Sequence, residues 1–164
     1  MGHNTLLVRE ADLGSAARQP MNVFAAVLID LGGSLTLEVC GQQMPVPGLR
    51  RRLDQSHLQQ QYSSRRVLVE IRPEHLHDAS VGLPPGAGRA GRTASVLHGI
   101  VRAVRVDGSD RILDVEVADA AGWQPAPRLT ARVDPRSTAE AGDAVMLAVD
   151  LRHLRVLTAD GDPR

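Results

Sequence analysis

Two histidines separated by a single residue are the first feature of the chain that could bind a metal ion. In an extended strand, the spacing of His75 and His77 places both imidazoles on one face. A metal site needs at least one further ligand, which the fold would have to bring from elsewhere. We therefore predict ordinary surface or capping histidines, with no metal and no cofactor. The candidates for a third ligand are Cys40, His57, Asp78 and His98.

The side chains that could act as nucleophiles stand in unsuitable surroundings. Ser34 follows two glycines, but Thr36 occupies the position where the G-x-S-x-G turn of a serine hydrolase has its second glycine. Cys40 ends a predicted strand, and small buried thiols are commoner than reactive ones. Asp114 and Glu116 lie on the polar face of another predicted strand, where solvation is expected. We predict no catalytic residue and therefore no enzyme activity for this chain.

A glycine-rich stretch, Gly86–Gly91, has the G-x-G-x-x-G spacing of dinucleotide-binding proteins, and Asp110 follows at about the distance of a ribose-binding carboxylate. That motif requires a strand before the glycines and a helix after them. Here Pro84 and Pro85 precede the stretch, and a β-rich segment beginning at Val96 follows it. We interpret the glycines as a loop without a nucleotide.

Charge and aromatic content argue against nucleic-acid binding. The formal net charge is zero, and the basic residues gather only at 50–52 and 65–66. Only 2% of the residues are aromatic, which leaves no stacking platform for single strands. Trp123 stands beside a proline-rich turn, where its ring either packs over the end of a barrel or contacts a partner. We retain Trp123 as a candidate partner contact.

Composition also limits the compartment and the core. All 19 basic residues are arginine, so lysine-dependent chemistry is excluded. The single cysteine cannot form an internal disulfide, and no apolar run approaches the ~18 residues of a membrane span. We expect a cytoplasmic protein. With 43% hydrophobic residues and few aromatics, the core is predicted to consist of Val, Leu, Ile and Ala.

Most of the chain has the alternating apolar and polar pattern of half-buried strands. The N-terminal part differs: residues 1–20 are expected to be a leader, and the apolar run 22–29 fits either a strand or a short helix, of which Asn22 as an N-cap favours the helix. Residues 49–62 predict a surface helix or a long loop, and 80–91 predict a loop. The predicted strands are 35–39, 67–71, 96–106, 113–117, 129–133, 145–149 and 154–157.

The segment from Val67 to Leu76, VLVEIRPEHL, is the most specific motif in the chain. It resembles the V-x-V-G-I-R-P-E-H-L stretch in the regulatory domain of maltose-type and glycerol-phosphate-type ABC importer ATPases, also called the transport-associated OB domain. Glu70 replaces the glycine of that stretch. The resemblance implies a structural role, in which a strand ends, a proline stops ladder pairing and a turn crosses to the next barrel. The residues given this role are Ile71, Arg72, Pro73, Glu74 and His75.

Three further segments are similar to the same family in the same order. Pro20–Ile29 resembles its P-x-N-L-F-V-A-x-F-I segment, Gly99–Gly108 the opening of its second barrel, and Thr130–Leu157 its closing strands. The resemblance implies an all-β fold of tandem OB-like small barrels with interleaved strands and one or two short helices. It places this domain at 21–164, with a first barrel at about 30–71 plus the C-terminal strands and a second at about 96–145.

The resemblance implies a function as well. Such a domain is the regulatory and dimerisation part of the ATP-binding subunit of a carbohydrate ABC importer. It would pair with a second copy of itself, contact the ATPase domain and permease subunits, and respond to a regulatory protein. The ATPase motifs of the family lie outside this chain, so no ATP hydrolysis is expected from it. The implied location is cytoplasmic, peripheral to the inner face of the cell membrane.

Two alternatives remain open. Related transport-associated domains bind oxyanions such as molybdate, so the chain could instead be a sensing module for an oxyanion or a sugar. OB-type barrels also bind nucleic acid, although the neutral charge and missing aromatics disfavour this reading.

Overall fold

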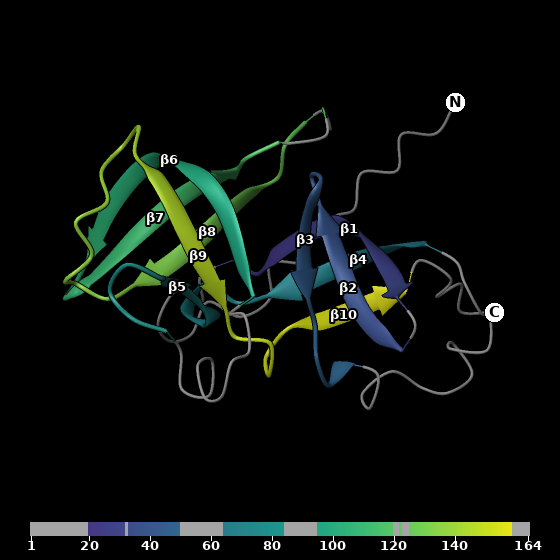
Figure 1. Cartoon of the computed structure of the whole chain (residues 1–164). Helices are drawn as coiled ribbons and strands as arrows, with labels where there is room; N and C mark the ends of the chain where they lie inside the picture. Colours follow the sequence, from purple (N-terminus) through teal and green to yellow (C-terminus); the bar gives the residue numbers. More distant parts are fainter. Residues whose placement is uncertain are drawn as a thin grey trace, which may run out of the picture.

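The computed structural model describes residues 20–31, 33–49, 64–83, 95–119, 122 and 125–158. Figure 1 shows the described strands in two five-stranded sheets that lie side by side. No helix in this part of the chain is long and apolar enough to cross a bilayer. The strands are β1 (Asn22–Leu31), β2 (Ser34–Val39), β3 (Gln42–Pro45), β4 (Arg65–Ile71), β5 (Leu76–Asp78), β6 (Val96–Asp107), β7 (Asp110–Val117), β8 (Arg128–Val133), β9 (Ala144–Val149) and β10 (Arg155–Thr158).

The chain passes from the first sheet to the second and then returns. The first sheet has the strand order β10-β4-β1-β2-β3 and the second β5-β9-β6-β7-β8, with antiparallel neighbours throughout. The crossing occurs at η2, a single 3₁₀ turn at Pro73–His75, and β10 brings the C-terminal part back to the first sheet (Figure 1). The prediction of an all-β fold of small OB-like barrels with interleaved strands is confirmed.

The predicted helix at 22–29 is wrong, because this segment forms most of strand β1. Burial alternates along it, with Phe24, Ala26 and Leu28 buried and the residues between them more exposed. A period of two is the pattern of a strand, and β1 pairs with β2 on one side and β4 on the other. These ladders satisfy the backbone polar groups of β1. Asn22 is not an N-cap, and its side chain instead bonds to the backbone of the other sheet.

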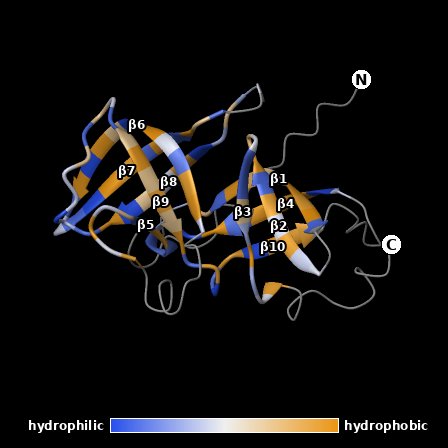
Figure 2. Ribbon diagram, viewed as in Figure 1, coloured by the Kyte–Doolittle hydropathy of each residue, from blue (hydrophilic) through white to orange (hydrophobic). Residues whose placement is uncertain are grey.

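The core is aliphatic, as the composition predicts. Side chains from both sheets form one contiguous cluster, in which Phe24 is the one aromatic residue among those described. Figure 2 shows hydrophobic and hydrophilic residues alternating along the strands. Burying one leucine side chain contributes about 2 kcal/mol, so this shared cluster stabilises both sheets together. The largest fully buried side chains include Leu37, Met44, Leu49, Ile71, Leu76, Leu97, Ile112, Leu113, Leu129, Leu147 and Leu154.

A two-residue turn joins β2 to β3. Its residues, Cys40 and Gly41, have φ angles of 51° and 77°, and positive φ at both positions is typical of the hairpin turn that matches strand twist. The Cys40 side chain is fully buried. Burial, with a smaller contribution from Asp119, raises the pKa of the Cys40 thiol, so the group remains protonated and acts as a packing residue.

Side-chain amides join the two sheets at a contact region that we call the amide seam, formed by Asn22 and Gln42. Asn22 Nδ2 donates to the Thr130 carbonyl at 2.8 Å, and the Thr130 N–H donates back to Asn22 Oδ1 at 2.7 Å. Gln42 Nε2 donates to the carbonyls of His98 and Ala118 at 2.9 and 2.7 Å, and the His98 N–H donates to Gln42 Oε1 at 2.7 Å. The seam thus adds side-chain hydrogen bonds to backbone groups of the second sheet.

Candidate functional site

An open pocket of about 610 Å³ lies beside η2, where β4 leaves the first sheet and β10 returns to it. We call it the junction pocket. Its wall contains apolar side chains from β10 and from the ends of neighbouring segments of the first sheet, and a concentration of ionisable side chains. The ionisable residues of the junction pocket are Glu70, Arg72, His75, Arg152, His153 and Arg155.

Strand register brings the two pocket histidines together. Leu76 in β5 pairs with Val149 in β9, so the preceding His75 lies next to Asp150, whose N–H donates to the His75 carbonyl at 3.0 Å. A turn after Asp150 carries His153 back over this point, and the His153 N–H donates to the Asp150 carbonyl at 3.1 Å. The imidazoles of His75 and His153 consequently stack, with ring centroids 3.8 Å apart and planes 2° from parallel.

Asp150 is the buried anion beneath the histidines, with a side chain 8% exposed. Arg152 donates to it three times: Nε at 3.0 Å and the backbone N–H at 3.1 Å to Oδ1, and a terminal nitrogen at 2.8 Å to Oδ2. The Nδ1 of His153 lies 3.1 Å from Oδ2. The Arg152 hydrogen bonds outweigh burial and hold the pKa of Asp150 well below its usual range, so Asp150 stays ionised at neutral pH.

The surroundings of the His75 ring in this stack shift its pKa. Burial and the neighbouring His153 lower the pKa of His75, although Glu74 and Asp150 act in the opposite direction. An imidazole usually titrates near pH ~6.5, so a lowered pKa leaves His75 neutral at pH 7. His75 therefore adds no positive charge to the junction pocket, whose arginines remain charged.

The three pocket arginines differ in how completely they are paired. Arg152 is held by Asp150. Arg72 lies 3.8 Å from Glu74, and these two side chains are 57% and 45% exposed, so the pair is weak. Arg155 lies opposite Glu70 in the β10–β4 register, yet it forms no ion pair within the described part of the chain. Arg155 and Arg72 are therefore the cations that an incoming anion can engage.

The family-motif residues all lie at the crossing between the sheets. Ile71 is buried at the end of β4, and Pro73 is buried at the start of η2. Arg72 precedes η2 in an extended conformation, and Glu74 is exposed beside it. His75, the last residue of η2, faces the junction pocket.

The sequence-based ligand set around His75 and His77 does not assemble in the structure. Asp78 and His98 border a different hollow, and Cys40 is buried in the β2–β3 turn, while His57 lies outside the described residues. Asp150 and His153 meet His75 instead, and the sequence reasoning missed them. Their D-x-x-H spacing after a strand was the available signal, but the pairing of β5 with β9 was needed to place it beside His75.

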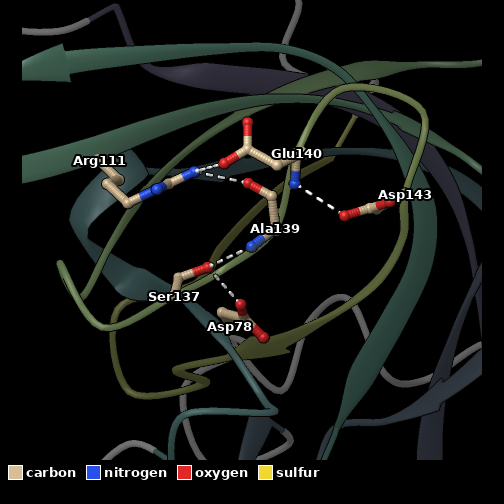
Figure 3. Close-up of polar contacts among 6 residues, drawn as sticks. All are labelled: Asp78, Arg111, Ser137, Ala139, Glu140 and Asp143. Atoms are coloured by element: carbon tan, nitrogen blue, oxygen red, sulfur yellow. Dashed lines mark hydrogen bonds and ion pairs between the residues drawn. The ribbon is translucent and has the colours of Figure 1, made fainter.

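A second hollow, of about 470 Å³, is bordered by Asp78 and Asp143, and its carboxylates already have partners. Figure 3 shows the network: Ser137 Oγ donates to Asp78 at 2.5 Å, and the Glu140 N–H donates to Asp143 at 2.9 Å. Arg111 donates to the Ala139 carbonyl at 2.6 Å (Figure 3). These bonds fix the 134–143 segment against β5 and β7, which is a structural role.

Other residues considered from sequence have ordinary positions or lie outside the described part. Glu116 pairs with Arg102 at 3.0 Å, and Asp114 pairs with Arg105 at 3.3 Å, across adjacent strands of the second sheet. These are the solvated cross-strand pairs that the alternation predicts. The candidate partner contact Trp123, the glycines at 86–91 and the arginines at 50–52 all lie outside the described residues.

Comparison with known proteins identifies a similar fold but assigns the chain to no family. No protein-family model and no curated sequence matches the chain. Among solved structures, the chain is similar to the cytoplasmic molybdate-binding protein ModG, in a crystal form with molybdate bound. The TM-score is 0.52 and the identity 13%, and the match covers 84% of this chain and 95% of that one. The likeness shows a shared OB-type fold over nearly the whole of ModG.

Proposed function

We propose that this protein is a non-catalytic binding module that takes up a small oxyanion in the junction pocket. The observation that carries the proposal is the meeting of Arg72 and Arg155 in one open pocket, where Arg155 forms no ion pair with any described residue although Glu70 lies opposite it in the strand register. The similarity in fold to ModG, a molybdate-binding protein, supports the same class of ligand. The location we propose is the cytoplasm.

The chemistry of the pocket suits a tetrahedral oxyanion. A guanidinium donates several N–H bonds in one plane and remains charged at all relevant pH values, so two of them can engage different oxygens of one anion. The pocket volume of about 610 Å³ exceeds that of a bare anion and leaves space for an organic group attached to it. Glu70 opposes binding, because its carboxylate faces the same space.

The test is calorimetric titration with molybdate, sulfate and a sugar phosphate at pH 7.5 and constant ionic strength. We expect saturable binding of one of these ligands, weakened about tenfold or more by Arg155→Ala, since a charge-assisted hydrogen bond contributes roughly 1.5–3 kcal/mol. Glu70→Gln is expected to tighten binding. Arg102→Ala is the matched control, because Arg102 is paired with Glu116 on the other sheet. Equal affinity in Arg155→Ala and the wild type would contradict the proposal.

A second candidate is the regulatory domain of a sugar ABC importer's ATP-binding subunit. The observation in its favour is that the segment resembling that family, Val67–Leu76, forms the crossing between the sheets and carries Arg72 and His75 into the junction pocket. In this role the domain pairs with a second copy, contacts the ATPase domain, permease subunits and a regulatory protein, and works at the inner face of the membrane. The two candidates are compatible, because a ligand that prefers one arrangement of a regulatory domain shifts its equilibrium.

Sedimentation velocity separates the second candidate from the first. A regulatory domain of this kind is expected to dimerise as its concentration rises into the high micromolar range. A sample that stays monomeric there, while still binding an oxyanion, would remove the importer role and keep the binding module.

A further inference from the structure

Three side chains at the edge of the junction pocket form a set of metal ligands. One ligand atom from each of His75, Asp150 and His153 lies within 4.8 Å of the other two. Two imidazole nitrogens and one carboxylate oxygen are a donor set that Zn²⁺ and neighbouring divalent metals accept. We infer that these three residues bind one divalent transition-metal ion, such as Zn²⁺ or Co²⁺, whose remaining coordination positions face the open pocket.

The backbone holds two of the ligands in place before any ion arrives. The pairing of β5 with β9 fixes His75 beside Asp150, and the Asp150 N–H bond to the His75 carbonyl, at 3.0 Å, closes that ladder. Asp150 is buried, so its carboxylate has few alternative positions. A site held on strand ends loses less conformational entropy on binding than one built from free loops.

Arg152 acts on the site from outside the ligand set. Its guanidinium donates to both oxygens of Asp150, at 3.0 and 2.8 Å, and thereby orients the carboxylate toward the histidines. Hydrogen-bonded ligands of this kind are common around bound metals. The positive charge of Arg152 also opposes a cation, so the affinity is expected to be lower than that of a thiolate site.

Binding requires one side chain to move. An imidazole nitrogen directs its lone pair in the plane of the ring, and the rings of His75 and His153 are stacked with planes 2° from parallel. One ion cannot lie in both of these planes. His153 is the ring that has to turn, because its side chain is 48% exposed and sits on the turn before β10. Loss of the stack is therefore an expected signature of metal binding.

The test is titration with Zn²⁺ and with Co²⁺ in a buffer free of phosphate and other oxyanions. The whole chain is used with His3→Ala and His57→Ala, which removes the two histidines outside the described residues. We expect one ion per chain, a Co²⁺ absorption band, and shifted imidazole proton resonances for two histidines. Loss of a residue that hydrogen-bonds a metal ligand usually lowers metal affinity by about 10–100-fold. Loss of a ligand itself should cost at least as much, so His153→Ala is expected to reduce the affinity by ~10-fold or more.

Two variants and one cross-check make the outcome decisive. His98→Ala is the matched control, because His98 is exposed on β6 and belongs to no ligand cluster among the described residues. His75→Ala should weaken metal binding as much as His153→Ala does. If the His75→Ala variant fails to fold, the result for His153→Ala, at an exposed residue, is sufficient. Binding that is absent, or equally tight in His153→Ala, would overturn the inference. Arg155→Ala removes a positive charge from the pocket and should weaken oxyanion binding without weakening metal binding, so failure here and failure of the oxyanion proposal are separate results.

Discussion

In the amide seam, neutral side chains bond to backbone groups of the opposite sheet, whereas the junction pocket gathers charged and titratable side chains around an open space. Both regions lie where the two sheets come together. The Asn22 amide donates one hydrogen bond to Thr130 and accepts one from it, while Arg155 has no ion pair among the described residues. The contrast indicates that the seam serves stability and the pocket serves binding, and substitutions should separate these two effects.

The largest stability effect is expected from Asn22→Leu. The change leaves the N–H and the carbonyl of Thr130 without partners at a position where Asn22 is 6% exposed. A buried polar group that loses its partner costs about 1–3 kcal/mol, so we expect the free energy of unfolding to fall by roughly 3 kcal/mol. Urea denaturation measures it. Val23→Thr, on the exposed face of the same strand, is the control and should change stability little.

A smaller loss, with a distinct pH dependence, is expected from Ser137→Ala. Burial alone would raise the pKa of Asp78, but hydrogen bonds from Ser137 and Ser80 outweigh it and leave that pKa below its ordinary value. A lowered pKa in the folded state stabilises the fold above the unfolded value of about pH 3.9, and this contribution is lost as the pH falls through the folded pKa. Ser137→Ala removes the 2.5 Å bond to Asp78.

We therefore expect Ser137→Ala to lower the free energy of unfolding by about 1–2 kcal/mol at pH 7 and by less below pH ~3.5. Denaturant unfolding at several pH values provides the measurement. Thr138→Ala, a substitution at an exposed neighbouring residue, serves as control. A loss of equal size at pH 7 and at pH 3 would show that the hydroxyl contributes through packing alone.

The sequence predicted those parts of the molecule that depend on local pattern. Alternation correctly predicted the strands at 67–71, 113–117 and 129–133. The helix predicted at 22–29 was wrong, because an apolar run of eight residues fits both the two-residue period of a strand and the 3.6-residue period of a helix. Which neighbours a strand pairs with is a long-range property. Asn22 has a turn-like preference in isolation, but in the fold the start of β1 lies close enough to β8 for its amide to exchange two hydrogen bonds with Thr130.

The candidate site was even less accessible from sequence. His75 could be singled out because it ends a recognisable motif, but its partners Asp150 and His153 lie 75 to 78 residues further along the chain. Only the register of β5 against β9 brings them together. Arg155 likewise gains its position from the return of β10 to the first sheet, which no local pattern announces.

Gln42→Leu tests whether the second half of the seam matters less than the first. Gln42 makes three hydrogen bonds to the other sheet, but these contacts are exposed, so water can replace the lost partner. We expect the free energy of unfolding to fall by about 1 kcal/mol, clearly less than for Asn22→Leu. Equal losses in the two variants, measured by urea denaturation, would mean that exposure does not distinguish the two halves.

The smallest stability effect is expected from Arg155→Ala, and that result would complete the separation of the two regions. Arg155 is exposed at the edge strand β10, and substitutions at such surface positions usually change stability by no more than about 0.5 kcal/mol. The substitution leaves the packing of the core unchanged, because Arg155 is not part of the buried cluster. Thermal unfolding of Arg155→Ala without ligand should therefore match the wild type, while the stabilisation by added oxyanion, which grows with ligand concentration over the dissociation constant, should shrink. If Arg155→Ala lowered the melting temperature without ligand as strongly as Asn22→Leu does, Arg155 would contribute to the stability of the fold as Asn22 does. The assignment of Arg155 to ligand binding would then be wrong.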